Sequence, residues 1–192
     1  MSSSSRPEAG QGLIVLDRDG VINRESAEFI KSAEEWLPLP GSLEAIAALT
    51  RAGFVVVVAT NQSGVGRGLI TQTALREINS RMRREIERAG GQLAGIFVCP
   101  HRPEDKCSCR KPEPGLLHQI EARFGCSLKD RPVIGDSARD IEAAQAVGAR
   151  AMLVRTGNGV ETERGFHGDS SVEVYDDLAA AARALIDTGV AR

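Results

Sequence analysis

Aromatic residues, long apolar runs and an excess of either charge are all scarce in this chain of 192 residues. Its longest apolar run, Phe54 to Ala59, is far shorter than the roughly 20 residues that a bilayer-spanning helix needs. No membrane segment is therefore expected. Basic and acidic residues nearly balance at 24 and 26, so no broad positive surface is available for nucleic acid. The low aromatic content of 4%, without an evident apolar surface stripe, favours a monomer.

The N-terminal segment also lacks the features of a targeting sequence. Residues 1–12, MSSSSRPEAGQG, have neither the basic start nor the apolar centre of a secretion signal. A polar, serine-rich stretch of this kind cannot bury enough apolar surface to fold. We predict a disordered tail over residues 1–12, one domain over residues 13–192, and a cytoplasmic location.

Cysteine is scarce too, but three of the four cysteines fall close together. Cys99, Cys107 and Cys109 form, with His101, the pattern C-x-H-x₅-C-x-C. In a chain without a secretion signal, such a cluster is more often a metal site than a disulfide framework. Three thiolates and one imidazole make a closed tetrahedral Zn²⁺ site, which predicts structural zinc. The alternative, a Cys107–Cys109 disulfide, would close a strained ring. Cys126 stands apart and is expected to be a small buried apolar residue.

Short β-branched runs alternate with helical patterns along the chain, which predicts an α/β fold with a Rossmann-like parallel sheet and helices on both faces. The expected strands are Leu13 to Leu16, Phe54 to Ala59, Gly95 to Val98, Pro132 to Ile134 and Ala151 to Val154. The expected helices run from Ser42, as N-cap, to Gly53, from Thr71 to Gly90, from Pro114 to Phe124, from Ser137 to Val147 and from Asp176 to Ile186.

The first strand runs directly into Asp17-Arg-Asp19-Gly20. Ligands of open α/β sheets bind beyond the carboxyl ends of the strands, so both acids arrive where a site should lie. Two neighbouring carboxylates repel each other unless a cation offsets their charge, and Mg²⁺ prefers such oxygen ligands. One acid can attack phosphorus while the other protonates the leaving oxygen and then activates water. Solvated acids at a strand end are the plain alternative.

Three further groups follow later strands. Thr60-Asn61-Gln62-Ser63 could hold phosphate oxygens through its hydroxyl and turn N–H groups, although a helix-capping turn would look similar. Arg110-Lys111 offers two cations, of which Lys111 could neutralise a transferred phosphoryl group; an exposed basic pair is the alternative. Asp136 ends the next strand, with Asp140 one helical turn later, and could complete a Mg²⁺ shell.

The ordered motifs D-x-D, T-N, R-K-P and G-D-x-x-x-D, which span Leu13 to about Val154, resemble those of the haloacid dehalogenase superfamily. The resemblance implies a phosphatase with Asp17 as nucleophile and Asp19 as general acid/base. It also implies that Thr60 and Lys111 stabilise the phosphoryl group. Mg²⁺ would be bound by Asp17, the backbone carbonyl of Asp19, and Asp136.

Many members of this superfamily carry an inserted cap domain, for which this chain leaves little room. About 35 residues separate Asp19 from the second strand, and they read as a loop and one helix. The later insertion place holds a helix, a strand and the zinc-binding loop. We therefore expect no large cap domain and an open site, walled by the zinc-binding loop and by residues 23–28.

At finer detail the sequence is similar to the D-glycero-D-manno-heptose-1,7-bisphosphate 7-phosphatase family. The residues that carry this similarity are Leu16-Asp-Arg-Asp-Gly-Val-Ile-Asn23, Thr60-Asn-Gln-Ser-Gly64, Cys99-Pro-His101 and Cys107-Ser-Cys-Arg-Lys-Pro112. The similarity implies that a small phosphorylated sugar is the substrate, in bacterial nucleotide-heptose synthesis for surface polysaccharides. It assigns Arg110 to substrate recognition. It assigns contacts with the sugar and its second phosphate to Glu25, Ser26, Ala27 and Glu28, and to Asn61, Gln62 and Ser63.

One departure and two alternatives accompany this interpretation. Some members of the family have Lys after the fourth-motif Asp, whereas this chain has Ser137, so a cationic contact at that position is in doubt. Histidinol-phosphate phosphatase, whose family shares the D-x-D motif and this type of zinc loop, is the alternative enzyme. A non-catalytic zinc-stabilised binding module is a further alternative, but it should have lost one of these acids.

Overall fold

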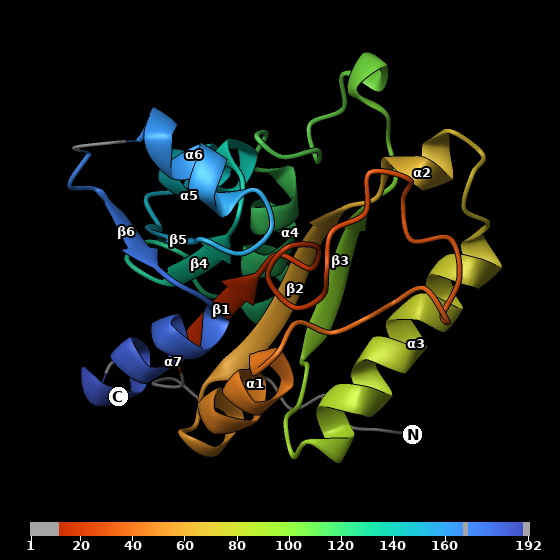
Figure 1. Cartoon of the computed structure of the whole chain (residues 1–192). Coiled ribbons are helices and arrows are strands. Elements are labelled where there is room, and N and C mark those ends of the chain that lie inside the picture. Colours follow the sequence, from red (N-terminus) through yellow and green to blue (C-terminus); the bar gives the residue numbers. More distant parts are fainter. Residues whose placement is uncertain (1–11, 167–168, 190–192) are drawn as a thin grey trace.

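A six-stranded, wholly parallel sheet forms the centre of the molecule, in the order β3-β2-β1-β4-β5-β6 (Figure 1). The computed structural model describes residues 12–166 and 169–189. Strand order reverses between β1 and β4, which is the doubly wound arrangement that opens a crevice at the carboxyl ends of those two strands. The strands are β1 (Leu13–Leu16), β2 (Val55–Asn61), β3 (Gly95–Cys99), β4 (Pro132–Gly135), β5 (Arg150–Val154) and β6 (Val172–Tyr175).

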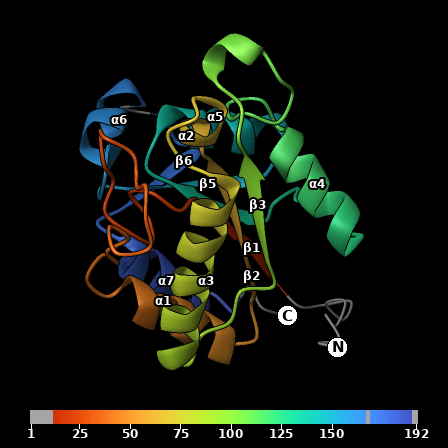
Figure 2. The same cartoon turned by 90° about the vertical axis from the view of Figure 1, so that its right-hand side faces the viewer.

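Helices cover both faces of the sheet, as Figures 1 and 2 show. On one face lie α1 (Ser42–Arg51), α3 (Gln72–Arg88) and α7 (Leu178–Asp187), and on the other lie α4 (Gly115–Phe124) and α5 (Ala138–Ala146). Short segments α2 (Ser63–Gly66), η1 (Pro103–Asp105) and α6 (Gly159–Gly165) lie near the carboxyl ends of the strands.

Two apolar cores result from this layering, because side chains of a strand alternate between the faces of a sheet. In β1, Ile14 and Leu16 join the core beneath α1, α3 and α7. Leu13 and Val15 of the same strand join the core beneath α4 and α5. The α/β class and the parallel sheet predicted from the sequence are therefore confirmed.

The sixth strand was not predicted from the sequence. β6 reads Val172-Glu-Val-Tyr175 and lies at the edge of the sheet, half-buried except for Val172, so it lacks the continuous apolar character of the inner strands. Its Glu173 forms an ion pair with Arg150 of β5. An edge strand needs one buried face only, and charged side chains there are common.

The predicted N-cap at Ser42 is wrong. The cap position is Gly41, at φ 76°, and the buried Ser42 is the first helical residue of α1. Its hydroxyl donates to the carbonyls of Ile22 and Leu39, at 2.7 and 2.9 Å. Ser42 thus anchors the preceding loop rather than the helix N-terminus. By contrast, Thr71 caps α3, because its hydroxyl accepts from the amide of Ala74.

Neither place where relatives carry a cap holds a separate domain, and both fall within the described residues. β1 and β2 are joined by a loop and α1, while α2, α3, β3 and α4 lie between β2 and β4. No helix in the described ranges is long and apolar enough to cross a membrane. Of the predicted tail, residues 1–11 lie outside the described part, and Gly12 is buried, its carbonyl accepting from Val55.

Candidate active site

The site lies where the strand order reverses, at the carboxyl ends of β1 and β4. Asp17 follows β1 directly, and its amide donates to the carbonyl of Ile134 in β4, at 2.9 Å. Asp136 follows β4. These two acids come from segments more than a hundred residues apart, and the topology alone brings them to one crevice.

Three carboxylates meet in that crevice. Oxygens of Asp17, Asp136 and Asp140 lie within 4.8 Å of one another, and Asp136 and Asp140 are each 2% exposed. Burial, opposed by the charge of Lys111, raises the pKa of Asp17 to about 7. Burial and the charge of Asp17 raise the pKa of Asp136 to about 8. Without a further cation these acids cannot all be ionised near neutral pH, so the donor set fits a divalent cation with oxygen ligands.

Lys111 provides a positive charge in this acidic group. Its Nζ lies 2.9 Å from Asp17 Oδ1 and 2.5 Å from Asp140 Oδ1, and it donates to the carbonyl of Ala59 at 2.7 Å. The two carboxylate contacts are ion pairs without ordinary hydrogen-bond geometry. Burial lowers the pKa of Lys111, but the charges of Asp140 and Asp17 raise it more, so its net pKa is raised. Lys111 therefore stays charged and lies beside the Asp17 carboxylate.

Asp140 holds other residues of the site in place. Its Oδ2 accepts from the amide and the hydroxyl of Ser137, at 3.1 and 2.6 Å, which forms the capping box of α5. Its other oxygen pairs with Lys111. Both oxygens are thus committed, which leaves Asp17 and Asp136 as the acids of the group that are best able to hold a cation. Ser137 brings no positive charge to the site, in keeping with the doubt raised by the sequence.

Asp19 is held by hydrogen bonds from three side chains. Arg18 donates to both of its oxygens, at 3.1 and 3.0 Å, Asn23 donates to Oδ1 at 2.8 Å, and Gln62 donates to Oδ2 at 2.7 Å. Asn23 is itself oriented by the buried indole of Trp36, at 2.9 Å. The carboxylate is consequently fixed in direction by groups from two separate loops.

Two glycines leave the room that Asp136 needs. A Cβ at Gly20 or at Gly157 would lie only 2.1 Å from Asp136 Oδ2, and both residues have positive φ, at 79° and 59°. A side chain at either position would collide with the carboxylate and strain the backbone. The glycine of the Asp17-x-Asp19-Gly motif is therefore explained by close approach to the acid of another strand.

Asn61 connects β2 to the segment that carries Lys111. Its side-chain amide donates to the Lys111 carbonyl at 3.0 Å and its carbonyl accepts from the Lys111 amide at 3.1 Å. Thr60 is buried, and its hydroxyl accepts from Gln62 Nε2 at 3.0 Å. Contrary to the turn expected from the sequence, Thr60 and Asn61 are the last residues of β2.

Two adjoining cavities open onto these residues. The inner cavity, about 70 Å³, is lined by Asp17, Asp19, Glu25, Asn61, Lys111, Asp136, Ser137, Arg139, Asp140 and Asn158. The middle cavity, about 250 Å³, is lined by Arg18, Asp19, Glu25, Ser26, Ala27, Phe29, Ile30, Asn61, Gln62, Ser63, Arg110 and Arg139. Asp17, Asp19, Lys111 and Asp136 are thus brought together as the motifs require. Thr60 and Glu28 line neither cavity: Thr60 lies beneath the site, and Glu28 faces solvent.

Sequence reasoning missed Arg18, Asn158 and Arg139. Asn158 donates to Asp136 Oδ2 from its amide at 2.8 Å and from its side chain at 3.2 Å, and its side chain also donates to Glu25. Asn158 lies in the loop after β5, so the expectation that site residues follow the carboxyl ends of strands would have located it. Arg139 lies inside the fourth motif, between Asp136 and Asp140.

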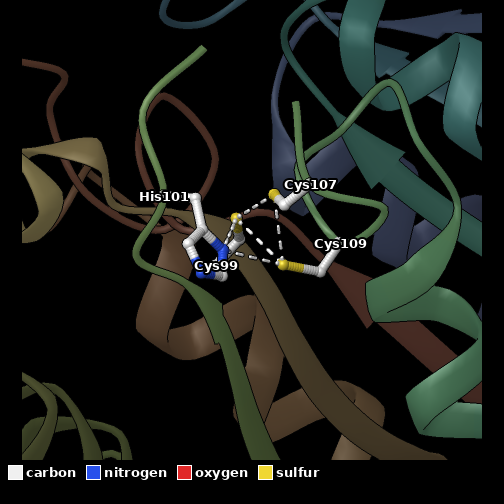
Figure 3. A group of neighbouring side chains, drawn as sticks. All are labelled: Cys99, His101, Cys107 and Cys109. Atoms are coloured by element: carbon white, nitrogen blue, oxygen red, sulfur yellow. Dashed lines mark hydrogen bonds between the residues drawn. The ribbon is translucent and has the colours of Figure 1, made fainter. Parts of the chain in front are cut away.

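A second ligand cluster lies in the Cys/His loop, residues 99–110, which joins β3 to Lys111. Figure 3 shows the sulfurs of Cys99, Cys107 and Cys109 and the imidazole of His101 turned toward one another. Their contacting Sγ and Nδ1 atoms are 3.2 to 3.6 Å apart, and all four cysteines of the chain are free. The expectation that Cys126 is fully buried is not met, since it is half-buried at the margin of a core.

This spacing fits a tetrahedral metal and not a disulfide. Sulfurs around zinc at about 2.3 Å lie about 3.8 Å apart, and a sulfur and a nitrogen lie about 3.5 Å apart. A disulfide requires about 2.05 Å, so the 3.5 Å between Cys107 and Cys109 excludes that alternative in this structure. Burial raises the pKa of Cys99 to about 12, so a thiolate there needs a nearby cation. The donor set therefore fits Zn²⁺.

Comparison with known proteins finds similar sequences along most of the chain. A family model described as HAD-hydrolase-like matches residues 108–181. The D-glycero-beta-D-manno-heptose-1,7-bisphosphate 7-phosphatase of Bordetella bronchiseptica is 48% identical over 174 residues, which cover 91% of this chain and 97% of that protein. The protein of the same name from Pseudomonas aeruginosa is 47% identical over 176 residues, which cover 92% and 98%.

Solved structures are similar along the same length. The crystal structure of D,D-heptose 1,7-bisphosphate phosphatase from B. bronchiseptica, complexed with magnesium and phosphate, has a TM-score of 0.89 at 47% identity, covering 92% of this chain and 99% of that one. The corresponding enzyme from Burkholderia thailandensis has a TM-score of 0.73 at 40% identity, with the same coverage.

Proposed function

Since this chain belongs to the D-glycero-beta-D-manno-heptose-1,7-bisphosphate 7-phosphatase family, we propose that it removes the 7-phosphate of D-glycero-D-manno-heptose 1,7-bisphosphate. One observation carries the proposal beyond family membership: Asp17, Asp19, Lys111 and Asp136 line one small cavity that adjoins a larger, sugar-sized one. The phosphatase would act in bacterial nucleotide-heptose synthesis, for lipopolysaccharide core or S-layer.

The proposed chemistry uses the two acids after β1 in sequence. Asp17 attacks the phosphorus of the 7-phosphate, and the bond from phosphorus to the sugar oxygen breaks as the aspartyl-phosphate forms. Asp19 gives its proton to the departing oxygen, then takes one from the water that hydrolyses the aspartyl-phosphate. The ion pair between Lys111 and Asp17 supports the assignment of Asp17 as the nucleophile, because the positive charge of Lys111 favours the ionised carboxylate.

The remaining residues would bind and orient the substrate. Lys111 and the Thr60 hydroxyl would stabilise the phosphoryl group, and Arg110 would recognise the substrate. Contacts with the sugar and its second phosphate would come from Glu25, Ser26, Ala27 and Glu28, and from Asn61, Gln62 and Ser63. For Thr60 and Glu28 this requires a local movement, since neither lines the cavities.

Mg²⁺ would be held by Asp17, the Asp19 backbone carbonyl and Asp136. When bound, it neutralises charge shared between these carboxylates and the phosphate. Its support is the donor set described above. Asn158 and the two glycines fix the direction of the Asp136 carboxylate, so this ligand is oriented in advance.

Zn²⁺ would be held by Cys99, His101, Cys107 and Cys109, with a structural role because no coordination position is left open. A metal site needs reduced cysteines, and the cytoplasm keeps thiols reduced, which supports a cytoplasmic location for this protein. A monomer remains a prediction.

The substrate is tested by measuring kcat/KM with Mg²⁺ on heptose 1,7-bisphosphate and on histidinol phosphate. We expect a preference for the heptose bisphosphate of about tenfold or more, because a site with polar groups for a second phosphate rejects a substrate that leaves them unpaired. Preference for histidinol phosphate would overturn the substrate assignment and leave the phosphatase chemistry intact.

A further inference from the structure

Arg139 lines three cavities around the reacting groups, although no motif points to it. It lines the inner and middle cavities defined above, and also an outer cavity of about 680 Å³ between α5 and the Cys/His loop. That outer cavity is lined by Pro103, Lys106, Cys107, Ser108, Arg110, Lys111, Pro112, Glu113 and Arg139. Arg139 therefore lies at the junction through which a ligand would leave the inner cavity.

The guanidinium of Arg139 has no acidic partner among the residues that the structure describes. It lies in the first turn of α5, where the helix dipole disfavours a cation. An exposed arginine can tolerate such a position through hydration. Arg139 is exposed, so water can reach its guanidinium, but the same side chain also lines two cavities together with a second arginine.

That second arginine is Arg110, at the end of the Cys/His loop. It lines the middle and outer cavities together with Arg139, and its one hydrogen bond in the described residues goes to the carbonyl of His101, at 3.3 Å. Carboxylates also line these cavities, Asp19 and Glu25 in the middle one and Glu113 in the outer one, but neither guanidinium forms an ion pair with them in the described residues. Both positive charges are therefore available to a ligand anion.

The position of this pair relative to Asp17 identifies which anion. A phosphate that reacts with Asp17 would lie in the inner cavity, beside Lys111. The other end of the same substrate would extend past Arg139 into the middle cavity, where both guanidiniums are available. Planar guanidinium groups suit phosphate oxygens, to which they can donate in pairs.

We propose that Arg139 and Arg110 together bind the second phosphate of a bisphosphorylated sugar, and that Arg139 determines the preference for bisphosphates over monophosphates. The inference rests on the proposed function and adds a residue to it. In this chain, Arg139 takes the place of the cation that Ser137 lacks.

The test compares Arg139→Gln with wild type on heptose 1,7-bisphosphate and on heptose 7-phosphate, at the same Mg²⁺ concentration. Losing one charge-assisted contact should lower kcat/KM on the bisphosphate by about 10- to 100-fold, mainly through KM. The value for the monophosphate should change less than about threefold, since its reacting end does not need this contact. If the lost charge acted only through the metal, kcat/KM would fall equally for both substrates. Arg139→Lys should recover part of the loss, because the charge remains without the paired donors.

Arg84→Gln, which removes an exposed arginine of α3, is the matched control and should leave both values unchanged. If wild type prefers the bisphosphate and Arg139→Gln keeps that preference, this inference is wrong while the proposed function stands. An equal loss on both substrates would also overturn it, since Arg139 would then act on the reacting centre. If the wild-type protein prefers histidinol phosphate to heptose 1,7-bisphosphate, the proposed substrate itself is wrong, and this inference, which rests on it, is wrong too.

Discussion

At the scale of single residues, the pairing of Lys111 with two carboxylates explains how a buried lysine is tolerated. Removing a charge from water is costly unless it is paired, and here Asp17 and Asp140 supply the partners. Because Asp140 is also held by Ser137, it can keep Lys111 in place beside Asp17. Asp140 is thus a positioning residue for the lysine.

Asp17→Asn should abolish turnover and leave the fold intact. An amide cannot attack phosphorus, so kcat should fall by roughly 10⁴-fold or more. Stability should be equal or higher without Mg²⁺, because the change removes repulsion with Asp136 and Asp140 while Lys111 keeps Asp140. Phosphate release, Tm and zinc content check these expectations.

The control for this change is Asp187→Asn, an exposed acid at the end of α7, which should keep full activity. Phosphate release by Asp17→Asn at a near wild-type rate would contradict the nucleophile assignment. Loss of zinc or a lower Tm would mean that the substitution acts through the structure.

Single residues were predictable where their role follows from their position after a strand. Asp17, Asp19 and Asp136 were found in that way, and Lys111 was found as one of two adjacent cations before a helix. The structure places all four on one cavity. Arg139 and Arg18 were not, because their importance depends on neighbours that only the folded chain provides. Glu28 was included only as part of a continuous segment, and its exposed side chain lines neither the inner nor the middle cavity.

At the scale of elements, the Cys/His loop connects an edge strand to the active site. Cys99 ends β3 and pairs with Asn61 of β2, and Arg110 and Lys111 follow Cys109 immediately. The loop also contacts α2, where the amide of Gly66 donates to Pro100 at 2.9 Å. A metal in this loop would therefore restrain residues that line the cavities of the site.

Removing the metal by Cys109→Ser should lower both stability and activity. We expect a lower Tm and a kcat/KM on heptose 1,7-bisphosphate reduced by about tenfold or more, because Arg110 loses its restraint. Metal analysis of the purified variant verifies the loss of zinc.

Cys126→Ser provides the matched control, because this cysteine is also half-buried but lies outside the cluster. It should keep its zinc and its activity. A Cys109→Ser protein without zinc but with unchanged kcat/KM would refute the coupling between the metal and the site.

Most elements could be predicted because interior strands and amphipathic helices have strong sequence patterns. The first five strands and the five longer helices are all present, with ends shifted by a few residues at most. The short α2 and α6 were missed, since four to seven residues give too little periodicity. Ser42 shows a different limit: a serine before a helix can bond to a distant loop, which local sequence does not reveal.

At the scale of the whole molecule, the strand order decides where the chemistry takes place. Alternation of strands and helices predicts a doubly wound sheet, and its crevice follows from the point where the order reverses. The exact fit within that crevice was not predictable, because it depends on side chains from loops after β1, β2, β4 and β5 at once.

The stability of the whole molecule should respond to pH and Mg²⁺ together. Without metal, the folded-state pKa values of Asp17 and Asp136, about 7 and about 8, lie above the ordinary value of 3.8. The folded protein then binds more protons than the unfolded chain, so stability falls as pH rises from about 4 to about 8. Mg²⁺ needs the ionised carboxylates, so its stabilising effect should grow over the same range.

Measuring Tm with and without Mg²⁺, at about pH 5.5 and about pH 8.5, checks this expectation. The rise in Tm on adding Mg²⁺ should be larger at the higher pH, and Asp136→Asn should lose most of it. An equal rise at both pH values would show that these carboxylates do not hold the ion.

The side chain of Asn61 forms two hydrogen bonds with the Lys111 backbone, one as donor and one as acceptor, as a neighbouring strand would. Lys111 is therefore clamped to a strand that belongs to the hydrophobic core, whereas Arg110, one residue earlier, depends on the loop. Lys111 and Arg110 are thus held in place by different parts of the structure. We therefore expect that losing the proposed zinc ion weakens substrate recognition through Arg110 more than the chemistry at Lys111. The protein without zinc should be a less selective phosphatase and not an inactive one.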